Sequence, residues 1–425
     1  MKKPVLSRVV QEQARVRTPL GQSIEAGVDP AKVISFASAW ADHESPALLM
    51  AKYAEICADR KLFHSSGGYT EPLGDMACRE ALAEFERREM GVDVSAENVA
   101  VGLGSTQILH NALVALCDPG EDVVLFDPTY ANYYIQMVFA LTDPCLVKEA
   151  GVTRSVPGAE VAYLPVLDVE QWRYMPEPSK ALARLEELCK VHNPRMLLFQ
   201  SPDNPTGQVV KDKFVGGALE LCEERGMFLV INMAYEAQLF GDAPKYYSLS
   251  PEEHPSLVTI HPNNVFGHSL GRRFGWLVGS KEVVEAVGKV QHATALCPDA
   301  LHQMAMTSYL RASVPDGSLR KYLSESRELT RKAADAAAEA IDKHLGMRHL
   351  KPDGGIYTVM DVGMDSEQFV ADALRNASVL FAPGKAFGNT LERAVRVSYG
   401  PFVNDHAKLE EGFERLGKHL SKKGK

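Results

Sequence analysis

The chain has 425 residues, of which 45% are apolar and 24% are charged, so it exceeds one ordinary domain and has the composition of a globular enzyme. Its formal net charge of −9 leaves no basic excess to neutralise nucleic-acid phosphates, and no apolar run is long enough to span a bilayer. The seven cysteines are scattered without a Cys-x-x-Cys pair, which argues against a disulfide or zinc framework and favours a reducing compartment. We therefore expect a cytoplasmic protein that binds no nucleic acid, no membrane and no metal.

The first three quarters of the chain alternate short apolar runs with segments of helical periodicity. The apolar runs predict strands at 98–101, 123–126, 196–200, 227–231, 257–260 and 276–278. Apolar residues at helical spacing predict intervening helices, among them 108–116 and 214–224. Strands that are apolar along their whole length and separated by helices are typical of a mostly parallel sheet covered on both faces.

After about residue 310 the pattern changes. A long helix rich in Ala, Glu, Lys and Arg is predicted over 324–345. It is followed by predicted strands at 356–360, 379–381 and 394–397 and by an amphipathic helix over 405–420. We therefore predict a large α/β domain over 46–310 and a smaller α+β domain formed by residues 1–45 and 311–425.

Two loops follow predicted strands in positions that suit ligand binding. Strand 98–101 leads through Gly104 into Ser105 and Thr106 at the start of a helix, where exposed N–H groups and the helix dipole suit a phosphate. Many α/β proteins also use such a turn purely for chain reversal. Residues 201–207, Ser-Pro-Asp-Asn-Pro-Thr-Gly, form a turn sequence at the carboxyl end of a strand, where open α/β sheets bind ligands.

Three further segments complete a set that resembles the class I and class II aminotransferases, pyridoxal-phosphate enzymes of fold type I, over roughly residues 30 to 415. These segments are Asn232-Met233-Ala234-Tyr235, Gly271-Arg272-Arg273-Phe274-Gly275 and Val395-Arg396-Val397-Ser398. The resemblance implies an α/β fold with a small α+β domain and an amino-acid-like small-molecule substrate. It also implies a homodimer in which each site is shared between subunits.

The resemblance assigns roles to single residues as well. The phosphate-type site that it implies comprises Gly104, Ser105, Thr106, Arg273 and, from the neighbouring subunit, Tyr69. It implies that Tyr130 stacks on the cofactor ring, that Asn204 and Tyr235 contact the cofactor's 3′-oxygen, and that Arg396 grips the substrate carboxylate in a bidentate fork. We therefore predict that Arg396, Asn204 and Tyr130 bind the substrate.

The sequence departs from the family at the lysine that forms the internal aldimine. The family carries this lysine about eight residues before the phosphate arginine. Here Asn264 takes the position, or Val265 if the count runs back from the arginine. No lysine occurs between Lys245 and Lys281, so no shift of the alignment restores one.

Two other positions depart from the family in the same site. The aspartate that the family places against the pyridine nitrogen is Asn232 here. A neutral amide cannot stabilise a protonated ring nitrogen by charge, so the ring would be a poor electron sink. The serine that helps the family bind phosphate is replaced by His261.

We expect an enzyme that acts on an amino acid or an amino-acid derivative without a covalent cofactor, such as a repurposed lyase, cyclase or transferase. Tyr235 and His268 are the predicted groups for proton transfer, because a histidine titrates near neutrality, and Asn264 is predicted to act in the lysine's place. His268 has an alternative as a loop residue satisfied by the backbone, and Lys385 is another source of an amine. Two alternative hypotheses remain: an enzyme that holds pyridoxal or pyridoxamine phosphate non-covalently, and a non-catalytic homologue that binds amino acids.

Overall fold

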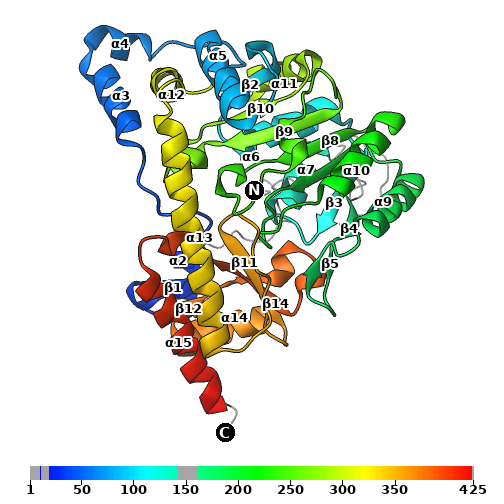
Figure 1. Cartoon of the computed structure of the whole chain (residues 1–425), viewed down its shortest axis with the longest axis vertical. Coiled ribbons are helices and arrows are strands. Elements are labelled where there is room, and N and C mark those ends of the chain that lie inside the picture. The colour runs from blue at the N-terminus through cyan, green and yellow to red at the C-terminus, as the bar shows by residue number, and fades with distance from the viewer. Residues whose placement is uncertain (1–9, 11–18, 142–160, 424–425) are drawn as a thin grey trace, which may run out of the picture.

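The computed structural model describes residue 10, residues 19–141 and residues 161–423 (Figure 1). Its largest element is a seven-stranded sheet with the strand order β2-β10-β9-β8-β7-β3-β4. The strands are β2 (Val99–Gly102), β3 (Val123–Asp127), β4 (Val161–Pro165), β7 (Met196–Gln200), β8 (Phe228–Asn232), β9 (Leu257–Pro262) and β10 (Gly275–Val278). Neighbouring strands are parallel, except that β10 is antiparallel to both β2 and β9. The predicted mostly parallel sheet is therefore confirmed.

The edge strand β4 was missed by the sequence prediction, whereas the six predicted strands all form within two residues of their expected bounds. The predicted strands are buried on both faces, so they read as continuous apolar runs. In β4 only every second residue is buried, and the strand ends in Pro165, a residue that weakens a strand prediction.

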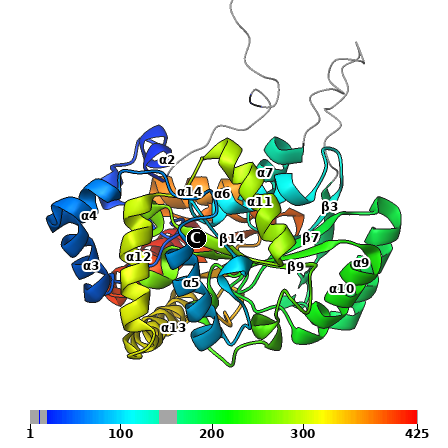
Figure 2. The same cartoon turned by 90° about the horizontal axis from the view of Figure 1, so that it is seen from above.

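Helices cover both faces of the large sheet (Figure 2). On one face lie α6 (Ser105–Leu116), α7 (Asn132–Leu141) and α11 (Lys281–Thr294). On the other lie α5 (Met76–Phe85), α9 (Pro178–His192), α10 (Asp212–Arg225) and α12 (Ala300–Ser313). No helix among the described residues has both the length and the apolar character needed to cross a bilayer.

The C-terminal part builds a second, smaller sheet. Its order is β11-β14-β13, with β11 (Tyr357–Asp361), β13 (Ala382–Pro383) and β14 (Ala394–Ser398). β1 (Ile34–Ser35) pairs with β12 (Val379–Leu380), so the N-terminal segment packs with the C-terminal part. α14 (Ser366–Ala377) and α15 (His406–Lys423) complete this α+β unit. The division at residues 45 and 310 remains a prediction. Residues 1–9 and 11–18 of the N-terminal segment lie outside the described part of the chain.

Five further elements come before the longest helix in the chain. They are the helices α2 (Pro19–Glu25), α3 (Ala47–Ala58) and α4 (Arg60–Ser65) and the two-residue strands β5 (Leu167–Asp168) and β6 (Arg173–Tyr174).

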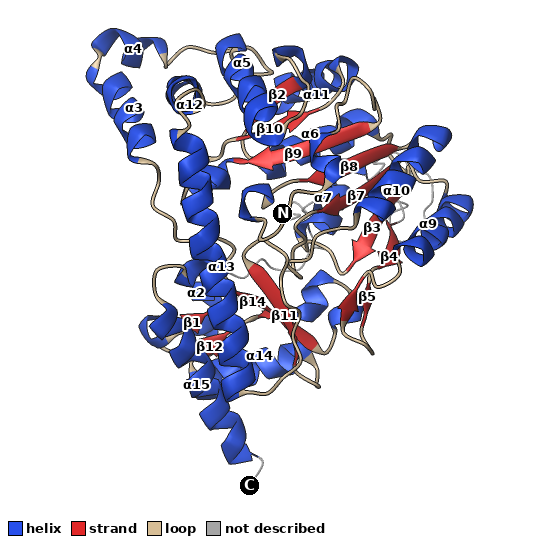
Figure 3. Cartoon of the chain, in the orientation of Figure 1, coloured by secondary structure: helices blue, strands red, loops and turns tan. Residues whose placement is uncertain are grey.

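The longest helix, α13 (Ser318–His344), runs from the large sheet to the small one (Figure 3). Leu319 and Leu323 pack in the core of the large sheet, whereas Ala337 and Ile341 pack in that of the small sheet. The helix begins earlier than the predicted residue 324, because Leu319 and Leu323 extend its buried face by more than one turn.

Side chains from the two sheets meet at the carboxyl ends of β7 and β8. Arg396 on β14 donates a 2.9 Å hydrogen bond from Nη1 to Oδ1 of Asn204, in the loop after β7. Tyr235, in the loop after β8, shares a 2.9 Å hydrogen bond between hydroxyls with Tyr357 on β11. Carboxyl ends of parallel strands are where open α/β sheets bind ligands, so the candidate site lies here.

Candidate active site

An anion site lies at the N-terminus of α6. Gly104 has a φ of 85°, and a Cβ built there would come within 2.7 Å of Nη2 of Arg273. A glycine therefore lets the guanidinium lie directly against the turn that starts the helix. No side chain caps α6, so the N–H groups of Ser105 and Thr106 and the positive end of the helix dipole stay available to an anion.

Arg273 is itself held in place by the backbone. Its φ of 49° is in the left-handed region, and its Nη1 donates a 2.9 Å hydrogen bond to the carbonyl of Leu270. The guanidinium is exposed, so its remaining N–H groups can reach a ligand. The structure thus brings together Gly104, Ser105, Thr106 and Arg273, as the sequence predicted. Tyr69 is 85% exposed on the segment that follows α4.

Asn232 takes the position that the family resemblance assigns to the partner of the cofactor's ring nitrogen, and its side-chain amide is already engaged in hydrogen bonds with neighbouring residues. Asn232, at the end of β8, donates from Nδ2 to the Tyr133 hydroxyl at 2.9 Å and accepts from the Ala234 N–H at 3.1 Å. Burial raises the pKa of Tyr133 well above its ordinary value, so this partner stays a neutral phenol. Tyr133 packs edge-to-face on Tyr130 at 5.3 Å, one helical turn away in sequence. That spacing was the signal that the sequence reasoning missed.

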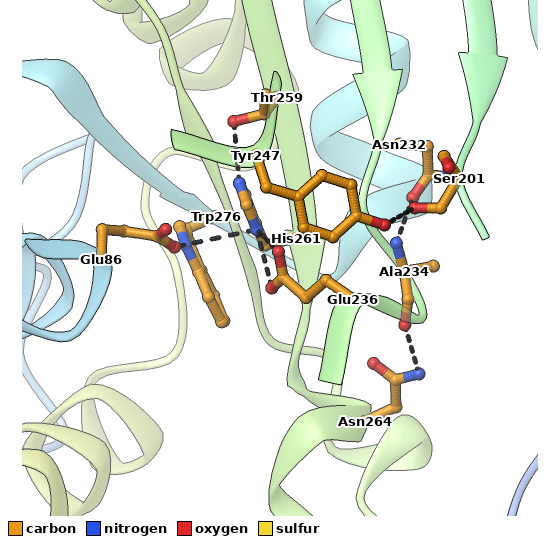
Figure 4. Close-up of polar contacts among 10 residues, drawn as sticks. All are labelled: Glu86, Ser201, Asn232, Ala234, Glu236, Tyr247, Thr259, His261, Asn264 and Trp276. Carbon is orange, nitrogen blue, oxygen red and sulfur yellow. Dashed lines mark hydrogen bonds and ion pairs between the residues drawn. The ribbon is translucent and has the colours of Figure 1, made fainter. Parts of the chain in front are cut away.

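Asn264, which the sequence resemblance places at the family's lysine position, lies in a short 3₁₀ turn at Asn263–Phe266. Its Nδ2 donates a 2.7 Å hydrogen bond to the carbonyl of Ala234. In Figure 4, Ala234 lies between Asn232 above and Asn264 below. Its Oδ1 is buried without a hydrogen-bond partner among the described residues. The side chain of Val265, the alternative position, lies outside the described part of the chain.

Arg396 is buried as a cation, and no carboxylate of the described residues forms an ion pair with it. It is 5% exposed, and its guanidinium lies 4.2 Å from the ring centre of Tyr357 and 4.8 Å from that of Phe387. Nη1 binds Asn204, Nη2 binds the carbonyl of Ala37 at 2.9 Å, and Nε has no partner within the described ranges. A buried charge needs a counter-charge, so this arrangement suits an incoming carboxylate.

The two predicted proton-transfer residues lie in different surroundings. Tyr235 is buried, and burial, with Tyr357 beside it, raises its pKa well above the ordinary value, so it acts as a phenol. His268 is exposed, its ring stacks on Trp40 at 4.7 Å, and its Nδ1 lies 3.6 Å from Asp42. A small cavity is lined by Trp40, Tyr235 and Asn264, but not by His268. Trp40 therefore separates His268 from the two other predicted catalytic residues.

Lys385 lies on the surface. Its Nζ is 3.6 Å from a carboxylate oxygen of Glu367, and both side chains are more than half exposed. Nothing in this position directs the amine towards Asn264.

A buried histidine–glutamate cluster, which sequence reasoning missed, lies beside the loop that carries Ala234 and Glu236 (Figure 4). His261 Nδ1 is 2.9 Å from Glu236 Oε1 and 3.7 Å from Glu86 Oε1, and the Trp276 indole N–H donates to Glu86 at 2.7 Å. Burial lowers the pKa of His261, but the two carboxylates outweigh burial and raise it overall. Burial raises the pKa of Glu86, against the attraction of the imidazolium. Glu236 directly follows the Asn-x-Ala-Tyr segment, and that adjacency was the available signal.

His261 faces away from the anion site. Its ring stacks on Trp276 at 5.3 Å, and Trp276 belongs to the core on the α5 side of the sheet. Its strand neighbour Ile260 packs in the core on the α6 side. The substitution of serine by His261 is therefore a change on the opposite face of β9, and the imidazole is not a replacement phosphate ligand.

The sequence profile of the family "Aminotransferase class I and II" matches residues 32–141 and 158–416, so the chain belongs to this family. An aspartate/prephenate aminotransferase of Thermus thermophilus is 29% identical over 371 residues, which cover 86% of this chain and 87% of the relative. Aromatic-amino-acid aminotransferase 2 of Thermococcus litoralis is 25% identical over 427 residues, 98% of each chain. The solved structure of the Thermus thermophilus aspartate aminotransferase with maleate has a TM-score of 0.80 and 26% identity, and the match covers 98% of this chain and 100% of that one. The predicted aminotransferase fold type I is confirmed.

Family membership implies pyridoxal phosphate, and the residues fit only one end of it. The turn at Gly104 with Arg273 and the start of α6 suits the phosphate. At the other end, Asn264 offers an amide in place of the primary amine that a covalent linkage needs. Asn232 has no charge to offer the ring nitrogen, and its amide is already bound to Tyr133 and Ala234. The side chain at the expected lysine position therefore does not fit a covalently attached cofactor.

Proposed function

We propose that this chain is an enzyme of the aminotransferase family that acts on an amino acid or an amino-acid derivative without a covalent aldimine. It would be a repurposed lyase, cyclase or transferase. The observation that carries the proposal is the side chain at the lysine position: Asn264 donates its amide nitrogen to Ala234 and cannot form a carbon–nitrogen linkage. The buried Arg396, whose Nε has no partner among the described residues, supports a pocket that still receives a carboxylate.

The proposed roles follow from the polar atoms that are free to act. Arg396 anchors the substrate carboxylate, with the rings of Tyr357 and Phe387 packed against its guanidinium. Tyr235 is linked to this anchor through Tyr357, and the two tyrosines share a hydrogen bond between hydroxyls that can hold or pass a proton. The anion site at Gly104 and Arg273 takes a second negative group of the substrate or of a bound ligand.

The test of this proposal is covalent. Purified protein reduced with borohydride, without added pyridoxal phosphate, should show no cofactor attached in stoichiometric amount to any peptide by mass spectrometry. The double variant Asn264→Lys, Asn232→Asp should restore trapping at residue 264. Cofactor attached in stoichiometric amount to one side chain of the unaltered chain, as purified, would overturn the proposal and return the protein to the ordinary transaminases.

The anion site favours a second candidate, in which pyridoxamine phosphate or pyridoxal phosphate binds without a covalent bond. This candidate predicts a new near-ultraviolet absorption band and a raised melting temperature when pyridoxamine phosphate is added, because a ligand that binds only the folded state stabilises it. If neither pyridoxamine phosphate nor pyridoxal phosphate changes the absorption spectrum or the melting temperature, this candidate is excluded and the first one stands.

We further propose a cytoplasmic homodimer. The support is the exposed ring of Tyr69, which the family resemblance assigns to the neighbouring subunit's phosphate, and the scattered free cysteines of the described residues. Sedimentation velocity should give a particle of twice the chain mass. Aspartate, prephenate and aromatic amino acids, which appear in the names of the relatives, are the first substrates to assay.

A further inference from the structure

Two buried polar atoms of opposite character flank Tyr235. Arg396 Nε is a donor and Asn264 Oδ1 is an acceptor, and neither has a hydrogen-bond partner among the described residues. Arg396 reaches Tyr235 through Tyr357, whose ring lies 4.2 Å from the guanidinium and whose hydroxyl lies 2.9 Å from that of Tyr235. Asn264 and Tyr235 line one cavity. Unmatched buried donors and acceptors are costly, so a ligand that satisfies both atoms is favoured.

The orientation of the Asn264 amide is fixed by its neighbour. The carbonyl of Ala234 can only accept a hydrogen bond, so the amide group 2.7 Å away must be Nδ2, and Oδ1 points to the other side (Figure 4). An amide oxygen only accepts hydrogen bonds. It therefore selects a donor such as an ammonium group and gives nothing to a carboxylate or a phosphate.

The cavity beside Asn264 has the size of such a group. Its volume is about 10 Å³, which is room for one water-sized group and too little for an aromatic ring. Gln238, 3% exposed, also lines it, and its Oε1 is a second buried oxygen without a partner in the described part of the chain. The rings of Trp40 and Tyr235 also line it and favour a cation over an anion. The rest of the lining carries no charged side chain and consists of Ala39, Ala41, Gly267, Leu270 and Ile356.

We propose that the pocket binds an α-amino acid as an intact zwitterion. Arg396 takes the carboxylate, and the amide oxygens of Asn264 and Gln238 accept hydrogen bonds from the α-ammonium group. The position that the family uses to bond the cofactor thus becomes a receptor for a free amine. This inference rests on the proposed function and specifies the form in which its substrate enters.

The experiment compares each amino acid with its own analogues. The full chain is titrated calorimetrically with the twenty protein amino acids and, for each that binds, with the matching 2-oxo acid and the matching amine without a carboxylate. The amino acid should bind at least about tenfold more tightly than either analogue, since a hydrogen bond to a charged group is worth roughly that factor or more. The measured quantity is the affinity for the amino acid divided by the affinity for the matching 2-oxo acid. A general loss of folded protein lowers both affinities alike and leaves this ratio unchanged.

Variants at the proposed ammonium receptor change this ratio in opposite directions. Asn264→Leu and Gln238→Leu should bring the preference for the amino acid over the 2-oxo acid towards one. Asn264→Asp should increase it, because a carboxylate attracts the ammonium group and repels the oxo acid. The matched control is Asn263→Asp: Asn263 also donates to a backbone carbonyl, that of Ser269 at 2.9 Å, but does not line the cavity, so its ratio should stay unchanged.

Two outcomes overturn the inference. The first is that none of the twenty amino acids binds. The second is that the ratio stays constant in Asn264→Leu and Gln238→Leu; if Arg396→Ala then still removes binding, the proposed carboxylate site stands and only the ammonium site fails. Failure of the proposed function itself would be recognised by another result: a cofactor that borohydride traps on the unaltered chain.

Discussion

The two ends of the candidate site differ in how they bind. The anion end uses the start of α6, the bare turn at Gly104 and the guanidinium of Arg273, and all three act through charge and N–H groups. The opposite end, where Asn264 and Asn232 lie, belongs in the family to chemistry that needs one particular primary amine and one particular carboxylate. The two ends use different atoms. Binding of an anion by charge and N–H groups therefore does not require the amine and the carboxylate of the covalent chemistry. A pocket can therefore keep one half and exchange the other.

The largest expected effect lies at the carboxylate anchor. Arg396→Ala should lower the affinity for any carboxylate ligand by at least about 100-fold, because it removes a desolvated charge that no other group replaces. Isothermal titration with the amino acid that binds best measures this. Arg272→Ala is the control: its guanidinium lies over the ring of Tyr53, away from Arg396, and its affinity should stay within about twofold of the unaltered chain. Equal losses in the two variants would contradict the assignment of the anchor.

A second expected effect concerns the buried cluster beside Tyr235. Burial, opposed by His261, raises the pKa of Glu86 from its ordinary 4.5 to about 7. A carboxyl whose pKa is raised by folding stabilises the folded state only while it stays protonated, so the free energy of unfolding should fall as the pH rises from about 4.5 to 7. Glu86→Gln, which cannot ionise, should be more stable than the unaltered chain at pH 8 by about 2 kcal/mol, less than the shift of Glu86 alone gives, because the ionised carboxylate also helps to raise the pKa of His261. The two chains should be equally stable at pH 4.

Urea unfolding curves at several pH values measure this difference. Glu84→Gln is the matched control on the same stretch of chain, because Glu84 forms only surface pairs with Arg87 and Arg88. Its removal should change stability by no more than about 0.5 kcal/mol at any pH. A Glu86→Gln variant that is less stable at pH 8 would show that the ionised carboxylate is needed in the fold.

The anion end gives a smaller and more local effect. Gly104→Ala should weaken binding of inorganic phosphate or pyridoxamine phosphate about tenfold, because the new Cβ displaces Arg273, which lies 2.7 Å away. Gly120→Ala is a close control, since its φ of 90° imposes similar backbone strain while nothing lies within 4 Å of the new Cβ. Both variants should lose about 1 kcal/mol of stability, but only Gly104→Ala should lose affinity. Equal affinity in both would remove the anion site.

The smallest effect separates a bound amide from a free one. Tyr133→Phe removes the hydroxyl that accepts from Asn232 and should cost about 1 kcal/mol in the free energy of unfolding. Tyr134→Phe, at an exposed neighbour, should change nothing measurable. If Tyr133→Phe is also silent, the amide of Asn232 is satisfied elsewhere, and the ring end of the pocket is more open than the hydrogen bonds indicate.

Burial on both faces made most of the fold predictable. Strands such as β7 and β8 are apolar from end to end, so their sequence carries their position in the sheet. β4 lacks that signature, and the early start of α13 depends on Leu319 and Leu323 meeting a core built by distant segments. Such contacts are not visible in a local window.

The residues of the site were predictable where they form motifs in the chain. Gly104, Arg273, Asn204 and Arg396 belong to local sequence patterns, and the structure brings them to one edge of the sheet or to its anion turn. Their partners Tyr133, Tyr357 and Phe387 arrive through tertiary packing from other elements. The orientation of His261 also escaped prediction, because its face of the strand is decided by the register of β9 against β10.

The helix α13 ties the two halves of the molecule into one mechanical piece. Its 27 residues form a rod of about 40 Å, anchored at Leu319 under one sheet and at Ile341 under the other. If either half unfolds, α13 loses its packing contacts with that half. We therefore expect the described chain to unfold in a single cooperative transition. If the small sheet moves when a ligand binds, α13 must tilt with it. This tilt will change the packing around Leu319 in the core of the large sheet.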